Sequence, residues 1–292
     1  MKKGLDVGYR ATKDNEGRIF LSAYSYYDKT ILGSKCLTID GKDYYVGRGM
    51  QNSDMNKTNS EMNKVCTFYN LCLSGGGVFQ LCVGLPVAQY QKQKQALKES
   101  ILEYNHCKIE YNRVPISFMI KDVYVVMQGV ASLYVDPSLI GDFIVIDIGG
   151  WTVDTSLVRL GSTESSLETH DTWYKGIRTL HSSVIEKVNN EFELTLEPDY
   201  AEEILKNGYA IVDGKKEPVD FLKPFLQTYV NEMIDEIKLK YPWRSTNIVL
   251  VGGGALLMYG AFRKHFPNCL VMPDPQFSNA KGYYAIACSK FQ

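Results

Sequence analysis

The hydrophobic positions of the chain follow two spacings that alternate along its length. Short apolar runs rich in β-branched residues predict strands, and longer stretches with apolar positions three and four apart predict helices. The predicted strands are residues 4–7, 19–21, 35–39, 43–46, 79–83, 113–118, 143–146, 155–159 and 248–251. The predicted helices are residues 89–105, 121–135, 179–192, 198–207, 218–241, 256–265 and 280–289. This alternation is typical of α/β proteins, in which helices cover sheets.

Two segments far apart in the sequence have the same local pattern. Asp6-Val7-Gly8 and Asp147-Ile148-Gly149-Gly150 each follow an apolar strand, turn at glycine and lead into another strand. The repetition predicts a duplicated architecture with two similar sheets facing each other across a cleft. Residues 47–64, rich in Asn, Ser, Lys and Met, are expected to form an exposed loop or a partner-binding segment.

Composition and charge narrow the class of protein. The chain has 292 residues, 45% of them hydrophobic, with only 10 Pro, which indicates one large or two medium globular domains. Because 32 basic residues balance 33 acidic ones, nothing favours direct contact with nucleic acid. The seven cysteines include no CxxC pair, which predicts reduced thiols in the cytoplasm. The chain starts with charged residues and has no apolar run of about 20 residues, which predicts a soluble protein without membrane attachment. The four His are expected to be surface or capping residues.

The first of three candidate chemical segments is the turn after residues 4–7. Gly8 lets the backbone turn tightly, so that amide groups converge on phosphate oxygens. Lys13 is in reach of a phosphate from the returning strand, and Asp6 is a candidate to hold water on a hydrated Mg²⁺. Taken alone, the segment fits a charged β-hairpin better than a binding site.

The second segment places two acids around a glycine pair. Asp147 and Asp154 lie seven residues apart, on either side of Gly149 and Gly150. Buried carboxylates are costly unless they are paired, hydrated or bound to a cation. A metal–phosphate site therefore explains this placement better than packing does.

The third segment is an apolar strand that ends in three glycines. Gly252, Gly253 and Gly254 precede a predicted helix, whose N-terminus favours negative charge. The string is not the GxGxxG dinucleotide fingerprint. A ligand contact and a plain helix-entry turn fit it equally well.

The order of these segments, near residues 6, 147 and 252, resembles that of the two phosphate loops and the adenosine motif in the superfamily of actins, sugar kinases and heat-shock chaperone ATPases. Within it, the chain is similar to bacterial actins of the ParM type, which move plasmids apart. Val83-Gly84-Leu85-Pro86 resembles a strand end of ParM-like proteins. The segment from Met127 to Tyr134 is similar to the helix that connects the two actin domains, and residues 280–287 resemble the closing helix of ParM.

The resemblance implies a role for each matching residue. Asp6 and Asp147 would hold hydrated Mg²⁺, Gln128 would orient the attacking water, and Asp147 or Asp154 would help to polarise it. Lys13 would contact a phosphate. The remaining residues expected to contact the nucleotide are Gly8, Tyr9, Arg10, Gly149, Gly150, Trp151, Thr152, Gly176, Glu202, Lys206, Gly252, Gly253 and Gly254. An i,i+4 ion pair in solvent explains Glu202 and Lys206 equally well. Trp151 replaces a small or hydroxylated residue of the family, which leaves ATP and GTP open.

The resemblance also implies a fold and a function. We expect an actin-like ATPase fold of two α/β domains, with residues 1–135 plus 274–292 in the first and residues 136–273 in the second. The implied function is a polymerising ATPase (or GTPase) whose filaments segregate plasmid DNA through a DNA-binding adaptor protein. A small-metabolite kinase and a bacterial cytoskeletal actin that acts without a plasmid are the alternatives.

Overall fold

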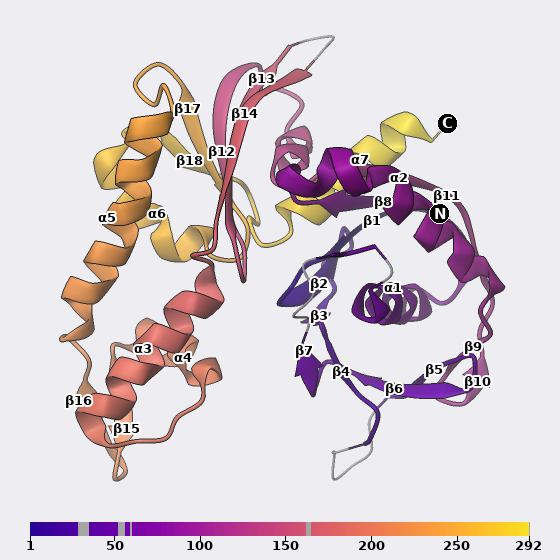
Figure 1. Ribbon diagram of the computed structural model, residues 1–292, viewed down its shortest axis with the longest axis horizontal. Helices are drawn as coiled ribbons and strands as arrows, with labels where there is room; N and C mark the ends of the chain where they lie inside the picture. Colours follow the sequence, from indigo (N-terminus) through magenta and orange to yellow (C-terminus); the bar gives the residue numbers. More distant parts are fainter. Residues whose placement is uncertain (29–34, 52–55, 59, 162–164, 292) are drawn as a thin grey trace.

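Two parts of the chain lie side by side in the computed structural model (Figure 1). The structure describes residues 1–28, 35–51, 56–58, 60–161 and 165–291. Residues up to β11 together with the C-terminal helix form one part, and residues from β12 to β18 form the other. Within the described ranges, no helix has the length and apolar character of a membrane span.

The central sheet of the first part contains the first strand of the chain. Its order is β11 (Phe118–Met127), β8 (Gly77–Leu85), β1 (Lys2–Val7), β2 (Ala11–Asp14) and β3 (Ile19–Leu21). β1 pairs in parallel with β8 and forms an antiparallel hairpin with β2. Helix α2 (Val87–Glu103), continued by the 3-10 turn η1 (Tyr104–His106), packs against β8 and β11.

A second sheet, of six short strands, lies across helix α1 (Glu61–Leu73). Its strands are β10 (Val114–Pro115), β9 (Ile109–Tyr111), β5 (Leu37–Ile39), β6 (Lys42–Val46), β4 (Ala23–Ser25) and β7 (Met50–Gln51). Glu61 joins helix and sheet, because its carboxylate accepts hydrogen bonds from Tyr24 Oη at 2.6 Å, Tyr44 Oη at 2.7 Å and Lys42 Nζ at 2.8 Å. Although partial burial opposes ionisation, these bonds lower the pKa of Glu61 to about 2.

The second part is built on a five-stranded sheet covered by helices. The strand order is β14 (Ser165–Trp173), β13 (Val153–Leu160), β12 (Gly141–Ile148), β17 (Asn247–Val251) and β18 (Cys269–Val271), and a hairpin of β15 (Tyr209–Val212) and β16 (Lys215–Pro218) stands apart. The helices are α3 (Ile177–Phe192), η3 (Pro198–Tyr200), α4 (Ala201–Asn207), α5 (Leu222–Lys240) and α6 (Ala255–His265). Ile144 and Ile146 of β12 belong to the core under α3, α5 and α6, while Val145 belongs to a separate cluster on the opposite face.

The C-terminal helix α7 (Ser278–Lys290) returns to the first part. It packs on β1 and on the 3-10 helix η2 (Val130–Val135). The approach is so close that a Cβ on Gly4 would lie 2.1 Å from the Ala280 carbonyl oxygen, and one on Gly84 would lie 1.8 Å from the Tyr283 hydroxyl. Only glycine fits at these two positions. The residue boundaries of the two predicted domains stay a prediction.

The predicted α/β architecture is confirmed, and six of the seven predicted helices are present, most of them with shifted ends. The helix predicted at 121–135 is wrong for residues 121–127, and only residues 130–135 are helical, as the 3-10 helix η2. Residues 118–127 form strand β11, which pairs with β8 along its length, and the alternation of buried Val123 and Val125 with exposed Tyr124 has the period of a strand. The strand predicted at 113–118 is interrupted between β10 and β11.

Residues 47–64 differ from the exposed loop predicted there. Residues 52–55 and 59 lie outside the described residues, and helix α1 begins at Glu61. Lys57 and Ser60 are buried, and Ser60 caps α1 by accepting a hydrogen bond from the Asn63 amide. The loop prediction therefore fails for the residues that lead into α1.

Candidate functional site

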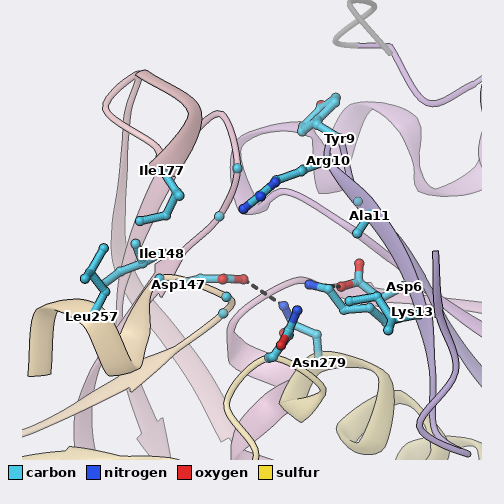
Figure 2. A pocket seen from close by; sticks show the side chains of 18 of the residues that line it. Asp6, Tyr9, Arg10, Ala11, Lys13, Asp147, Ile148, Ile177, Leu257 and Asn279 are labelled. Atoms are coloured by element: carbon cyan, nitrogen blue, oxygen red, sulfur yellow. Dashed lines mark hydrogen bonds and ion pairs between the residues drawn. The ribbon is translucent and has the colours of Figure 1, made fainter. Parts of the chain in front are cut away.

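A cavity of about 770 Å³ opens between the two parts of the chain (Figure 2). Its size is ordinary for a small-molecule site. All three glycine turns reach its wall. The predicted site residues that line it are Asp6, Gly8, Tyr9, Arg10, Lys13, Gln128, Asp147, Gly149, Gly150, Thr152, Glu202, Lys206, Gly252, Gly253 and Gly254. Asp154, Trp151 and Gly176 are not among the residues that line it.

The first turn connects β1 to β2. The Gly8 amide donates to the Ala11 carbonyl at 3.2 Å, which closes the turn tightly. Asp6 and Lys13 face each other in the strand register, with Lys13 Nζ 3.9 Å from Asp6 Oδ2. Asp6 is 2% exposed, and its Oδ1 has no hydrogen-bond partner within the described part of the chain. A buried carboxylate oxygen of this kind indicates a ligand site.

The second turn, between β12 and β13, repeats this geometry. The Gly149 amide donates to the Thr152 carbonyl at 2.9 Å, and the start of α3 supports the turn from behind. There the Arg178 amide donates to the Gly150 carbonyl at 2.8 Å, and a Cβ on Gly176 would lie 2.6 Å from the Gly150 carbonyl carbon. Gly176 therefore contacts the second turn and fixes its position.

Asp147, the last residue but one of β12, is held by residues distant in the sequence. Asn279 Nδ2 at the start of α7 donates to its Oδ2 at 2.8 Å (Figure 2). The oxygen of the Asn279 side-chain amide accepts from the Gly129 backbone amide at 2.8 Å. Burial raises the pKa of Asp147 to about 6, the nearby carboxylates Asp154 and Asp6 act in the same direction, and the Asn279 hydrogen bond opposes them. The cavity wall thus contains a carboxylate whose ionised form is destabilised.

The third turn leads from β17 into α6 and packs against Asp147. Gly252 has φ +85°, and a Cβ there would lie 2.4 Å from Asp147 Oδ1. The turn requires glycine at this position. Next to it, Leu256 and Leu257 are 67% and 52% exposed, which is unusual for large aliphatic side chains on one helix. Together with Ile177, they give the cavity an apolar side.

An ion pair connects the two parts of the chain at the opening of the cavity. Arg10 of the first part makes an ion pair with Glu202 of α4 in the second part, with Nη2 and Oε2 3.2 Å apart. His181 of α3 also lines the cavity and is 5% exposed, so its prediction as a surface or capping residue is wrong. Burial, followed by the positive charge of Arg10, lowers the pKa of His181.

Gln128 lines the cavity from a turn. It follows β11, and its backbone amide donates to the Leu85 carbonyl at 2.8 Å. The prediction that Gln128 lies on a helix is therefore wrong, because that helix is η2 and begins at Val130. Its role toward a water molecule stays a prediction.

Asp154 and Trp151 are placed behind the second turn. Asp154 Oδ2 accepts from Thr152 Oγ1 at 2.9 Å, and its Oδ1 accepts from Thr172 Oγ1 at 2.6 Å. Because Thr152 lines the cavity, Asp154 orients a hydroxyl group of the cavity wall. Asp154 itself would reach a ligand only through Thr152. The guanidinium of Arg178 lies over the Trp151 ring, with its Cζ 4.8 Å from the ring centroid.

The oxygens of Asp6 and Asp147 are of the type that Mg²⁺ prefers. No cluster of three or more His, Cys, Asp or Glu suited to a metal ion occurs in the described ranges. A cation at this site would therefore take only one or two carboxylates from the protein. Mg²⁺ fits such a site, because it usually keeps several waters and shares phosphate oxygens.

Sequence reasoning missed several lining residues. The adjacent Leu256 and Leu257 gave no decisive local signal, because two neighbouring apolar positions can both lie on the buried face of a helix. Asn279 gave none, since its contact with Asp147 spans 132 positions in the chain.

Comparison with known proteins relates both halves of the chain to actin homologues. Residues 4–130 match the family model of the N-terminal domain of actin-like proteins, and residues 145–264 match that of the C-terminal region of the archaeal, MreB-like actin homologue. The chain is an actin-like protein. A search of the curated proteins gave no match.

Solved structures of actin-like proteins have the same fold over the whole chain. The archaeal actin homologue Ta0583 is 24% identical, with a TM-score of 0.84 and 99% of both chains covered. A ParM from a 15-stranded filament of Clostridium botulinum is 21% identical, with a TM-score of 0.80 and 99% of both chains covered. The Alp12 filament protein is 19% identical, with a TM-score of 0.71, 100% of this chain and 99% of that chain covered.

Proposed function

We propose that this actin-like protein binds a nucleoside triphosphate, ATP or GTP, between its two parts and hydrolyses it. The observation that carries the proposal is that two turns of the same geometry, from two different sheets, face one cavity. Each follows a strand with a buried aspartate, Asp6 or Asp147. A crystal structure of Ta0583 in complex with ADP, 23% identical to this chain, has the same fold with a TM-score of 0.81, which supports a nucleotide as the ligand.

The polyphosphate would lie between the first and second turns. Residues 8–10 and the glycine pair 149–150 line the cavity there, and the Lys13 ammonium group would add a positive charge on the same side. Gly252, Gly253 and Gly254 would lie against the ribose and the α-phosphate, while Leu256, Leu257 and Ile177 would pack on the base. Glu202 and Lys206, at the opening, would contact the ribose or the base.

Hydrolysis would proceed by direct attack of water on the terminal phosphate. The Gln128 side chain would hold the water in line, and Thr152, oriented by Asp154, would help to position the phosphate. Asp6 and Asp147 would hold Mg²⁺ through water, and the ion would supply neutralisation of the phosphate charge.

We further propose that nucleotide binding drives self-assembly into filaments. Two of the similar structures, that of the Clostridium botulinum ParM and that of Alp12, are filaments. On this basis, the protein would act in plasmid DNA segregation through a DNA-binding adaptor. The predicted domains, 1–135 plus 274–292 and 136–273, would change their relative orientation on assembly.

A binding experiment tests the nucleotide site. Titration calorimetry with ADP and a non-hydrolysable ATP analogue, each with Mg²⁺, should show one site per chain in the wild type and a loss of at least about tenfold in affinity for Asp6→Asn. Asp142→Asn is the matched control, since Asp142 lies on β12 but pairs with Arg159 near the surface. Equal affinities of the wild type and Asp6→Asn would refute the assigned site.

An assembly experiment tests the rest of the proposal. Light scattering and phosphate release are followed together after addition of Mg²⁺ with ATP, GTP or ADP. Scattering that rises above a critical protein concentration, needs a triphosphate and is accompanied by phosphate release is the expected result. Absence of scattering at all concentrations, with turnover only when a small acceptor substrate is supplied, would refute filament formation and support the kinase.

A further inference from the structure

The second turn of the cavity is hydrogen-bonded to the segment that leads from β14 into α3. Three consecutive amides of this segment donate to three consecutive carbonyls of the turn, with Gly176 bonded to Trp151 at 3.0 Å, Ile177 to Gly149 at 3.0 Å and Arg178 to Gly150 at 2.8 Å. A trans peptide is planar, with its carbonyl and its amide hydrogen on opposite sides. These bonds therefore orient the amides of residues 150–152 away from the start of α3. Gly150 and Thr152 line the cavity, so a phosphate between the turns would meet amides in this orientation.

The same segment is anchored to α5 by a buried hydroxyl group. Tyr229 of α5 is 8% exposed, and its Oη donates to the Lys175 carbonyl and lies 3.2 Å from the Gly176 carbonyl oxygen. Three residues further along α5, Glu232 forms an ion pair with the Lys175 ammonium group. Because both side chains of this pair are about half exposed, the pair contributes little. The Tyr229 hydroxyl is therefore the stronger of these two contacts.

Tyr229 acts on the turn without being part of the cavity wall. It is not among the residues that line the cavity, and its ring belongs to the core of the second part together with Ile177. Removing the hydroxyl takes a hydrogen-bond donor away from the Lys175 carbonyl and leaves the ring packed. The segment before α3 is then free to move away from α5, and the second turn moves with it because their backbones are hydrogen-bonded.

We propose that Tyr229 is a positioning residue of the nucleotide site, whose hydroxyl group holds the start of α3, and through it the second turn, in the place that hydrolysis requires. This inference rests on the proposed function. A displacement of about 1 Å at groups that orient a substrate is enough to lower a reaction rate strongly. A residue of α5 that touches no ligand thus sets the rate of the chemical step.

Two tyrosine variants of the same helix test the proposal. Tyr229→Phe removes the hydroxyl group and keeps the ring. Tyr241→Phe is the matched control, because Tyr241 directly follows α5, is 5% exposed and has its hydroxyl 2.7 Å from Thr155 Oγ1. That contact connects the end of α5 to β13 instead of to the segment before α3. A general loss of stability therefore affects both variants, whereas a displaced second turn affects only Tyr229→Phe.

Two measurements separate the contact from its role in hydrolysis. Hydrogen exchange of the Gly176, Ile177 and Arg178 amides is followed by NMR without nucleotide, relative to the amides of the buried strand β17 in the same molecule. Single-turnover hydrolysis of ATP and GTP is measured at saturating nucleotide and expressed per bound nucleotide, so that an unfolded fraction does not enter the rate.

We expect Tyr229→Phe to speed the relative exchange of these three amides at least about fivefold and to lower the single-turnover rate at least about fivefold. Tyr241→Phe should leave both quantities as in the wild type. Exchange that is unchanged, or equally faster in both variants, would overturn the inference, as would equal hydrolysis rates in the two variants. Failure of the wild type to bind or hydrolyse nucleotide would refute the proposed function, and with it the role in hydrolysis, even where the exchange result is as expected.

Discussion

In the absence of nucleotide, the ionised side chain of Asp147 is predicted to destabilise the folded protein. It is 2% exposed, and burial together with Asp154 and Asp6 raises its pKa from 3.8 to about 6. A carboxyl group whose pKa is higher in the folded state contributes stability while it is protonated and loses that contribution as the pH rises through the folded-state pKa. The substitution Asp147→Asn replaces the ionised group by a neutral one of the same shape, whose oxygen still accepts the Asn279 hydrogen bond.

The size of the effect follows from the shift in pKa. Two units at 1.36 kcal/mol each amount to about 3 kcal/mol at pH 7.5, and almost all of this develops between pH 4 and pH 6.5. Asp147→Asn should therefore raise the free energy of unfolding by up to about 3 kcal/mol at pH 7.5 and by close to zero near pH 4. The same substitution should abolish binding of the nucleotide with Mg²⁺.

Urea unfolding in EDTA, followed by circular dichroism at several pH values between 4 and 8, measures this difference. Asp142→Asn serves as the control on the same strand, because Arg159 lowers the pKa of Asp142 and its loss brings no gain. A difference between wild type and Asp147→Asn that is absent, or independent of pH over this range, would refute the assignment of a destabilised carboxylate.

Three further substitutions probe other features of the structure. Gly252→Ala places a Cβ 2.4 Å from Asp147 Oδ1 at a φ of +85°. Thermal unfolding should therefore show a decrease of about 1–3 kcal/mol in the free energy of unfolding, and calorimetry should show no nucleotide binding. An affinity equal to that of the wild type would contradict the assigned contact. Tyr283→Phe removes a buried hydroxyl group that has no hydrogen-bond partner within the described part of the chain. It should leave the free energy of unfolding unchanged or raise it by up to about 1 kcal/mol. A clear decrease in the free energy of unfolding would show that the hydroxyl group has a partner. Glu61→Gln should lower the free energy of unfolding by about 1 kcal/mol at pH 7, because it weakens the contact with Lys42. In urea unfolding, this difference should disappear as the pH falls toward 2. A difference that does not change with pH would refute the role of the charge.

The sequence predicts those parts of the site that depend on short-range patterns. Asp6 and Gly8, like Asp147 and Gly149, lie within three residues of each other, and a strand that ends in glycine is visible without knowledge of the fold. The order of the turns was sufficient to predict the actin-like fold and those lining residues that belong to the turns themselves.

The remaining features depend on contacts that no local pattern records. Lys57 lies in a polar segment that is typical of an exposed loop, and only the packing of that segment against β8 and the first turn buries it. The strand β11 was predicted as a helix because its apolar positions fit both periods, and its pairing with β8 decides between them. Asn279 reaches Asp147 only because α7 folds back from the end of the chain.

The position of Asn279 has a consequence for the order of events during translation. Helix α7 covers β1, a strand made much earlier in translation, and supplies the side chain that holds Asp147. Because chains fold as they are synthesised, β1 stays without its covering helix until α7 leaves the ribosome. Up to that point the proposed nucleotide site is incomplete. If nucleotide binding drives assembly, a nascent chain can join a filament only after α7 has emerged, and polysomes whose chains lack α7 are protected from premature polymerisation.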